Sequence, residues 1–304
     1  MPNILVVGSL NADLVVRTPR FPQPGETISG EDLQVIPGGK GANQAVAAAR
    51  LGANVSMLGR VGKDNFGDFL INNLKSNHVD TSLIERDDAS TGTATIMVDS
   101  NGQNSIVLSA GANGKVSSLD VERASFSTFS LLLLQLEIPT LTVLSAAKLA
   151  KQNGVRVILN PAPAKPLPDE LIALADFIIP NETELSLLTG MVVNDIPSAE
   201  KAAYALLDKG AQNVIVTLGS KGALIVDKNT SQHVNTFKVD VVDTTAAGDA
   251  FIGCLASVLD SSNLLDAVRY ACACGALATT KFGAQPSLPN KEDVENIVGT
   301  QRNQ

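Results

Sequence analysis

The sequence has no tryptophan and few other aromatic residues, which limits the ligands that it suits. Only 4% of its 304 residues are Phe, Trp or Tyr. Proteins that bind single-stranded nucleic acid stack bases on aromatic side chains, and this chain offers few of them. Positive charge is also scarce, because 31 acidic residues outnumber 23 lysines and arginines and leave a net charge of -8. Nucleic acid and anionic membranes are therefore unfavourable partners.

Cysteine is nearly absent as well. The three residues Cys254, Cys272 and Cys274 lie in apolar sequence of helical character, and no CxxC pair accompanies them. The two histidines, His78 and His233, are far apart in the sequence, so no set of ligands for a structural zinc ion is indicated. We expect three buried free thiols, which fit a reducing cytoplasm.

Long hydrophobic runs are missing, although 44% of the residues are hydrophobic. The longest runs, such as 131–134 and 214–216, are far shorter than the roughly 20 residues of a membrane-spanning helix. The chain starts directly with an expected strand, without the basic and apolar regions of a signal peptide. These features predict a cytoplasmic protein with neither a signal peptide nor a membrane span.

Short apolar strands alternate with helical segments through most of the chain. Expected strands include 4–7, 55–58, 131–136, 155–159, 177–179 and 214–216, and expected helices include 65–77, 198–209 and 249–259. Such alternation predicts a mostly parallel sheet with helices on both faces, that is, a three-layer αβα sandwich. We found no long linker, so residues 1–304 are expected to form one domain.

Two segments depart from this pattern. The stretch 17–37 contains Pro19, Pro22, Pro24 and Pro37 and no helical periodicity, and the stretches 91–98 and 103–108 flank Asn101-Gly102, a strong hairpin signal. We expect a small antiparallel sheet built from segments about 15–38 and 91–110. Such a sheet could act as a lid or as a dimer surface.

Polar residues follow many of the expected strands. They are Asn11, Asp13, Glu137, Asn160, Asn181, Glu184, the loop 217–222 and the stretch 243–249. Because the carboxyl ends of parallel strands meet at one edge of an open sheet, where ligands bind, these residues are expected to form one site. For Asn11 and Asp13 taken alone, an Asx turn is an equally good interpretation.

The stretch 243–251 has the character of an anion site. Residues 239–242, apolar apart from Asp240, are typical of the end of a strand, residues 246–248 are small, and an apolar helix follows. A helix that begins in this way leaves N–H groups free for phosphate or another anion. Asp249 is then either a general base beside an anion hole or an ordinary helix-start aspartate.

A second glycine-rich stretch lies near the N-terminus. Gly38, Gly39 and Gly41 allow the backbone to approach a ligand closely, and Lys40 and Asn43 add hydrogen-bond donors. The spacing is not that of the GxxxxGK[ST] phosphate loop. Taken alone, the stretch could also be a flexible turn with an exposed lysine.

The two stretches 38–43 and 243–251 resemble the two signature motifs of the PfkB-type sugar kinases. Six further segments are similar to the ribokinase group of that family and occur in the same order; they are 8–13, 135–137, 160–164, 181–184, 217–222 and 281–287. The resemblance covers essentially the whole chain. It implies a ribokinase-like fold with a small β-sheet lid and a homodimer in which the lids pack together.

The resemblance also implies a reaction, the transfer of the γ-phosphoryl group of ATP to the 5-hydroxyl of D-ribose. Asp249 would be the general base, and the N–H groups of Ala246, Ala247 and Gly248 would form the anion hole. Together with Asp249, the implied sugar-binding residues are Asn11, Asp13, Gly39, Lys40, Asn43 and Glu137. The implied nucleotide and Mg²⁺ residues are Asn181, Glu184, Thr217, Gly219, Ser220, Gly222, Gly248 and Cys272.

A monovalent cation, K⁺, is implied beside the anion hole. Its matching positions are Asp243, Thr245, Ala278, Lys281, Gly283 and Ser287, the later ones through backbone carbonyls. Cys272 departs from the family, which usually has Asn or His near the adenine, and Phe282 is a milder variation. Open alternatives are a kinase of deoxyribose, fructose, a keto-sugar or a nucleoside, and a non-catalytic sensor. The shortage of aromatic residues makes a nucleoside-base pocket harder to build.

Overall fold

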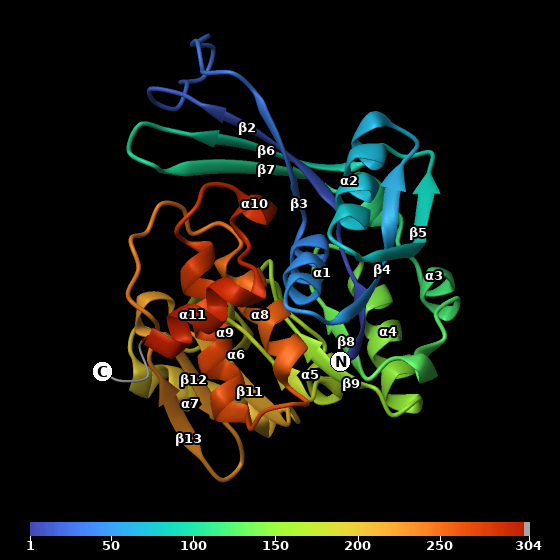
Figure 1. Cartoon of the computed structure of the whole chain (residues 1–304), viewed down its shortest axis with the longest axis vertical. Coiled ribbons are helices and arrows are strands. Elements are labelled where there is room, and N and C mark those ends of the chain that lie inside the picture. The colour runs from blue at the N-terminus through green and yellow to red at the C-terminus, as the bar shows by residue number, and fades with distance from the viewer. Residues whose placement is uncertain (301–304) are drawn as a thin grey trace.

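A nine-stranded sheet runs through the middle of the molecule (Figure 1). The structure is a computed structural model, and it describes residues 1–300. The strand order is β13-β12-β11-β10-β9-β8-β1-β4-β5, and within the described chain every neighbouring pair is parallel apart from β11–β12 and β12–β13. The strands are β1 (Asn3–Val7), β4 (Asn54–Gly62), β5 (Asp80–Asp87), β8 (Leu131–Leu134), β9 (Arg156–Leu159), β10 (Phe177–Ile178), β11 (Asn213–Thr217), β12 (Ala223–Val226) and β13 (Ser231–Val234).

The alternation of side chains along the central strands divides the core into two layers. In β1, Ile4 and Val6 pack into one core, while Leu5 and Val7 pack into the other. The first core is covered by α1 (Lys40–Arg50), α2 (Asn65–Ser76), α8 (Ala247–Val258), α9 (Leu264–Ala278) and α11 (Lys291–Thr300). The second is covered by α3 (Ser118–Glu122), α4 (Thr140–Gln152), α5 (Asp169–Leu174), α6 (Glu182–Thr189) and α7 (Ile196–Asp208). The predicted three-layer sandwich is confirmed.

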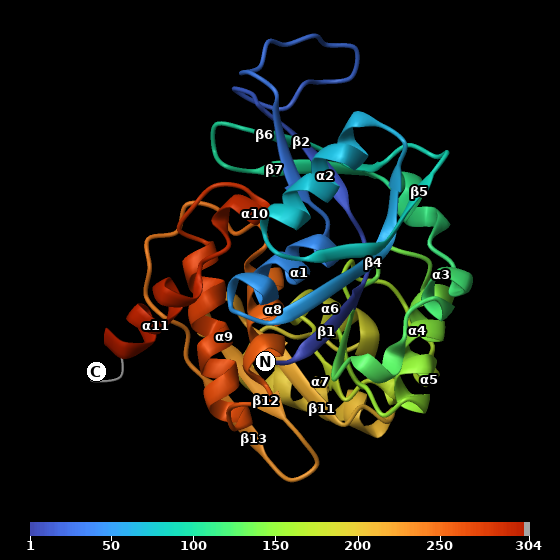
Figure 2. The ribbon, with the colours of Figure 1, turned by 45° about the vertical axis from the view of Figure 1, so that its right-hand side comes forward.

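A separate four-stranded sheet stands over one edge of the body (Figures 1 and 2). Its order is β3 (Gln34–Gly38), β2 (Asn11–Arg17), β6 (Gly92–Val98), β7 (Asn104–Ser109). The outer pairs are antiparallel, but β2 and β6 are parallel, so the sheet is mixed and not purely antiparallel as predicted. The reason is topological, because β2 continues from β1 and β6 from β5, and both leave the same carboxyl edge of the main sheet.

Several local predictions need correction. The run 239–242 is not a strand, and Val241 and Val242 are both 63% exposed. No neighbouring strand is available there among residues 1–300, since the sheet ends at β13 on this side. Asn11 and Asp13 lie in strand β2 and not in an Asx turn. Strand β5, which has exposed and half-buried residues but no fully buried one, was not predicted from the sequence.

Between Met1 and Thr300, no helix combines the length and the apolar character that crossing a membrane requires. The three cysteines are all buried, as predicted.

Candidate active site

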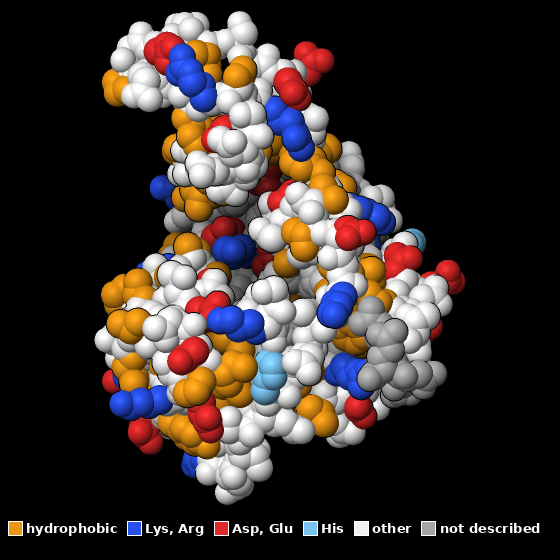
Figure 3. Space-filling view, turned by 90° about the vertical axis from the view of Figure 1, so that its left-hand side faces the viewer, with side chains coloured by type: hydrophobic (Ala, Val, Ile, Leu, Met, Phe, Trp, Pro, Cys, Tyr) orange, Lys and Arg blue, Asp and Glu red, His pale blue; other side chains and the backbone are white. Residues whose placement is uncertain are grey.

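A hollow opens between the small sheet and the body, above the carboxyl ends of the central strands (Figure 3). Acidic and basic side chains lie on its floor, while most charge elsewhere on this face is scattered. Glycines of the 38–43 stretch line up against the chain that leaves β1. A Cβ on Gly39 would lie 2.7 Å from the Asn11 nitrogen, and one on Gly41 would lie 2.6 Å from the Ser9 nitrogen. The stretch is therefore closely packed and not a loose turn.

Asp249 lies in the first turn of α8, facing α1. Its Oδ2 accepts a hydrogen bond from Asn43 Nδ2 at 2.9 Å, and its Oδ1 accepts one from Gln44 Nε2 at 3.0 Å. The residue is only 6% exposed. A helix-start aspartate could be satisfied by its own helix, whereas this carboxylate is held by amides of a helix more than 200 positions away in sequence.

One carboxylate oxygen of Glu137 accepts hydrogen bonds from residues near the ends of two other segments, 9–11 and 40. Its Oε2 accepts from the Ser9 hydroxyl at 2.5 Å, from the Lys40 backbone N–H at 3.1 Å and from Asn11 Nδ2 at 3.4 Å. Asn11 is in turn fixed by Asn113, whose Nδ2 donates to Asn11 Oδ1 at 2.7 Å. Segments from three distant parts of the chain thus meet at one carboxylate.

Several acidic groups interact electrostatically with one lysine, Lys40. Burial raises the pKa of Asp13 to about 7, with added repulsion from Glu137 and Asp249. Burial disfavours the charged form of Lys40, but the carboxylates of Asp249 and Glu137 outweigh it and leave the lysine pKa raised. Lys40 is therefore charged at neutral pH, and Asp13 is poised between its two forms.

The raised pKa of Asp13 gives a prediction about stability. The folded protein keeps a proton that the unfolded chain loses near pH 3.8, so stability falls as pH rises from about 4 to about 7. We expect Asp13→Asn to remove this cost and to raise the free energy of unfolding by about 2–4 kcal/mol at pH 8. Urea denaturation at pH 5 and pH 8 measures it. The gain must be larger at pH 8, and a loss of stability at pH 8 would contradict the assignment.

A cavity of about 860 Å³ lies at the N-terminus of α8, where it is lined by Ala247 and Gly248. Among the predicted nucleotide residues, it is lined by Asn181, Thr217, Gly219, Ser220, Gly222, Gly248 and Cys272. Phe237, Phe251 and Gly275 add apolar surface, and Cys272 is only 4% exposed. Residues predicted from separate motifs therefore share one cavity.

The N-terminus of α8 separates this cavity from the sugar-side residues. Ala246, the N-cap, has φ 60° in the left-handed region, which costs a non-glycine residue about 1–2 kcal/mol. The Ala247 N–H donates to Thr244 O at 3.3 Å, while within residues 1–300 the N–H groups of Gly248 and Asp249 donate to no protein acceptor. Free N–H groups beside a positive helix end attract an anion.

Glu184 does not line the cavity; it forms a capping box with Asn181 at the start of α6. Asn181 Oδ1 accepts from the Glu184 N–H at 2.8 Å, and Glu184 Oε2 accepts from the Asn181 N–H at 2.9 Å. Burial raises the pKa of Glu184. The NxxE spacing is thus explained locally by helix capping.

The predicted cation positions are partly brought together. Asp243 Oδ1 accepts from the Thr245 hydroxyl at 2.7 Å, and Asp243 Oδ2 accepts from the Gly283 N–H at 2.9 Å. Ala278 and Ser287 are buried nearby in sequence, at the end of α9 and in α10 (Ala284–Ser287). The Lys281 side chain is exposed and lines a shallow pocket with Arg50 and His78 instead.

Several residues that contact the predicted ones were not predicted from the sequence. They are Ser9, Gln44 and Asn113, which donate to Glu137, Asp249 and Asn11, and Gly253, where α8 touches α1. The available signal for Gln44 was a polar side chain within the apolar 42–49 stretch. Asn113 carried no comparable signal, because it lies in a short 3₁₀ helix (Gly111–Lys115) outside the predicted elements.

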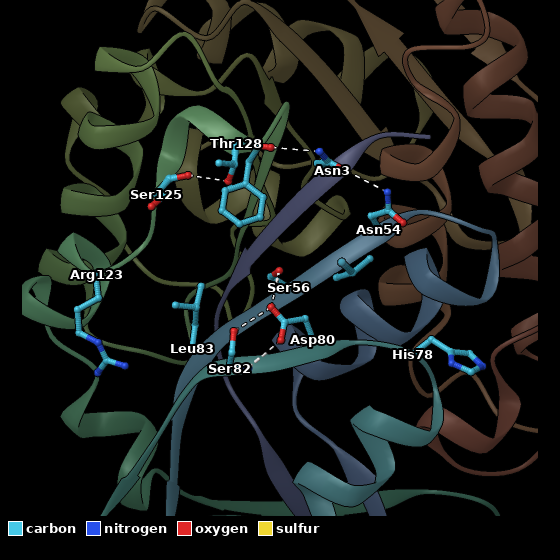
Figure 4. Close-up of a pocket in the computed structure, with 12 residues that line it drawn as sticks. Asn3, Asn54, Ser56, His78, Asp80, Ser82, Leu83, Arg123, Ser125 and Thr128 are labelled. Carbon is cyan, nitrogen blue, oxygen red and sulfur yellow. Dashed lines mark hydrogen bonds between the residues drawn. The ribbon is translucent and has the colours of Figure 1, made fainter.

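A polar pocket at the opposite, amino-terminal edge of the sheet holds none of the predicted site residues (Figure 4). Its polar groups pair with one another, since Asp80 accepts from Ser56 and Ser82. Asn54 likewise donates to Asn3.

Comparison with known proteins places this geometry in a family. The model of the pfkB family of carbohydrate kinases matches residues 1–291. A ribokinase of Haemophilus influenzae is 45% identical over 95% of this chain and 96% of its own length. A deoxyribokinase of Salmonella typhi is 43% identical over 97% and 98%.

The solved structure of Arabidopsis thaliana ribokinase complexed with ribose and ATP is also similar. It aligns with a TM-score of 0.91 at 36% identity and covers 98% of both chains. Full-length agreement in sequence and in fold leaves one conclusion: the chain belongs to the pfkB family of carbohydrate kinases.

Proposed function

We propose that this chain phosphorylates D-ribose at the 5-hydroxyl with ATP, giving ribose 5-phosphate and ADP. The observation that carries the proposal is the position of Asp249, a buried carboxylate that is bonded to Asn43 and Gln44 and directly follows Gly248, which lines a cavity of about 860 Å³. The Haemophilus relative named ribokinase and the Arabidopsis complex with ribose and ATP support the choice of substrates.

In the proposed reaction, Asp249 accepts the proton of the sugar hydroxyl as its oxygen attacks the γ-phosphorus of ATP. The bond between the γ-phosphorus and the bridging oxygen breaks, and ADP leaves. Of the predicted anion-hole groups, the N–H groups of Ala246 and Gly248 stabilise the charge on the transferring group, while the Ala247 N–H is bonded to Thr244 O. Lys40 adds positive charge beside them. Phosphoryl transfer depends mainly on such positioning and charge stabilisation.

Recognition of the sugar is assigned to the side chains on the floor of the hollow. Glu137 uses Oε2 for three protein donors, which leaves Oε1 for a sugar hydroxyl. Asn43 Oδ1 is buried and, among the described residues, has no partner, so it offers a second acceptor. Asn11, Asp13 and the Gly39 backbone complete the set. A polyol needs donors and acceptors at several fixed points.

ATP is assigned to the cavity beside α8, with the loop 217–222 and Cys272 around it. Asn181 and Glu184 would hold Mg²⁺, which would supply positive charge to offset the charge of the phosphates and prefers to keep part of its water shell. The capping box uses both side chains for protein contacts, which favours contact with the ion through water.

A panel of sugars assayed with ATP and Mg²⁺ tests the function. We expect ribose to give the highest kcat/KM. The relative named deoxyribokinase supports 2-deoxyribose as the second candidate, and a higher kcat/KM for 2-deoxyribose would favour it. If only fructose, another keto-sugar or a nucleoside is phosphorylated, the protein is still a kinase of this family, but its substrate is not ribose. Binding without transfer to any of them would indicate a sensor.

We also propose a K⁺ site next to the anion hole, built from Asp243, Thr245 and the carbonyls around Gly283. Asp243 already ties the turn before α8 to the 283 loop, so a cation there would order the anion hole. We expect K⁺, and not choline, to raise turnover. Asp243→Asn should raise the K⁺ concentration for half-maximal activity. Equal rates in both salts would contradict the site.

The small sheet is proposed to be a lid and a dimer surface within a single domain of residues 1–304. Strand β7 is exposed along its whole length, with Ile106, Val107 and Leu108 at 50–63% exposure. Apolar side chains in such a row favour contact with a second copy. Light scattering on the purified protein tests the expected dimer mass. The buried free thiols fit a cytoplasmic location, which fractionation of the source cells would test.

A further inference from the structure

A row of amide side chains crosses the main sheet beneath Asp249. Gln135 is the first residue after β8, Asn160 is the first after β9, and Ile179 is the first after β10. Gln44 of α1 lies against the first two. Gln44 and Gln135 are fully buried, and Asn160 is 7% exposed.

The amides are joined in one continuous set of hydrogen bonds. Gln135 Nε2 donates to Gln44 Oε1 at 2.6 Å. Gln44 Nε2 then donates both to Asn160 Oδ1 at 3.2 Å and to Asp249 Oδ1 at 3.0 Å. Asn160 Nδ2 donates to the backbone carbonyl of Ile179 at 3.2 Å.

A backbone carbonyl decides which atom of each amide donates and which accepts. The Ile179 carbonyl can only accept, so the Asn160 amide must turn its nitrogen there and its oxygen toward Gln44. Gln44 therefore meets two acceptors and must present its nitrogen to both. A flipped Gln44 would place its oxygen against the carboxylate of Asp249. Gln44 can therefore only donate to Asp249 and cannot accept from it.

Gln135 holds the other end of Gln44. Its Oε1 is buried and has no partner among residues 1–300. A Cβ on Gly8 would lie 2.1 Å from that oxygen, so the glycine leaves the space that Gln135 occupies. An unpartnered buried oxygen costs stability, so folding stability alone does not account for a glutamine here.

We infer that Gln44 is a positioning residue for the reaction, which holds the Asp249 carboxylate in its reactive orientation, and that Gln135 acts through Gln44. The inference rests on the proposed role of Asp249 as general base. Neither glutamine lines the nucleotide cavity or contacts the sugar-side carboxylate Glu137. Their effect should therefore fall on turnover and not on binding.

The test compares Gln44→Met, Gln135→Met and the double variant with the wild-type enzyme. Methionine keeps the length of the side chain and removes its amide. We expect Gln44→Met to lower kcat about 10- to 100-fold, as for a lost hydrogen bond to a charged group, with the KM for sugar and for ATP within about threefold. Gln135→Met should lower kcat less, and the double variant should be no slower than Gln44→Met.

Thr142→Val is the matched control, since Thr142 is buried and its hydroxyl donates to Val116 O on the far side of the sheet. It should lower the melting temperature and leave kcat unchanged. If Gln44→Met does not fold, Gln135→Met, which does not touch Asp249, carries the test alone.

Three outcomes would overturn the inference. They are a Gln44→Met enzyme with wild-type kcat, a loss that appears as a higher KM only, and full additivity in the double variant. If the wild-type protein transfers phosphate to no sugar, the proposed function itself fails; if it does transfer and these variants match it, only the positioning role fails.

Discussion

Asp249→Asn is expected to lower kcat by about 10³- to 10⁴-fold while leaving the dissociation constants for ATP and sugar within a few-fold of the wild-type values. Loss of a positioned general base costs turnover on this scale. Binding survives because the sugar contacts assigned to Glu137 and the nucleotide cavity remain. Isothermal titration for binding and a steady-state assay for turnover measure the two effects separately.

The structure also indicates how the amide that replaces the Asp249 carboxylate would fit. Gln44 cannot flip, so the new side chain must turn its oxygen toward Gln44 and its nitrogen toward Asn43. Asn43 can flip, since its Oδ1 has no partner within residues 1–300, and the flip removes one of the acceptors proposed for the sugar, which accounts for a change of a few-fold in sugar binding. Removal of the Asp249 charge relieves its repulsion of Asp13 and Glu184, but it also removes a counter-charge of the buried Lys40. Because the two effects oppose each other, we expect the melting temperature to stay close to that of the wild type.

Asp120→Asn is the matched control for this experiment. Asp120 is 5% exposed, close to the 6% of Asp249, and also lies in a first helical turn. It pairs with Arg60 and not with any residue of the hollow. This variant should lose stability and keep kcat. Wild-type turnover in Asp249→Asn would refute the assignment of the base.

Gly253→Ala is expected to have the second-largest effect, through the distance between α8 and α1. A Cβ at Gly253 would lie 2.6 Å from Gln44 O, 2.6 Å from Ala47 Cβ and 2.9 Å from Ala48 N. Backbone atoms cannot move aside locally, so the helices must separate. We expect the free energy of unfolding to fall by about 1–3 kcal/mol.

Turnover should fall as well, by about 10²-fold, because Asp249 would move away from Asn43 and Gln44. Gly299→Ala in α11 is the control, since nothing among the described residues lies within 4 Å of the added Cβ. It should gain up to about 1 kcal/mol from helix propensity. Chemical denaturation measures the free energy of unfolding of both variants, and a steady-state assay measures their kcat. If Gly253→Ala and Gly299→Ala have the same stability and the same kcat, the close contact of α8 with α1 at Gly253 does not matter for either property.

The fold was predictable where the sequence carries strong periodicity. Buried strands such as β8 are continuous apolar runs, and their alternation with helices predicts the sandwich. Strand β5 was missed because it lies at the edge of the sheet and carries mixed side chains. The run 239–242 was misassigned because apolar character alone predicts a strand only if a partner strand is available.

The sequence predicted which motif residues belong to the candidate site, but not which other residues they contact. Motif residues could be placed on the carboxyl edge of the sheet, and Asn43 and Asp249 do meet there. The contacts of Gln44, Asn113 and Gly253 could not be predicted, since they depend on how α1, α8 and the small sheet pack. Local patterns do not encode such long-range distances.

The most direct test of the central claim is the identity of the product formed from ribose and ATP. We would incubate the wild-type enzyme with both substrates and Mg²⁺, and record ³¹P and ¹H NMR spectra of the product. We expect one phosphate monoester coupled to the two protons on C5 of ribose, and almost none with Asp249→Asn. A phosphate on any other carbon, or equal product from the variant, would contradict the claim.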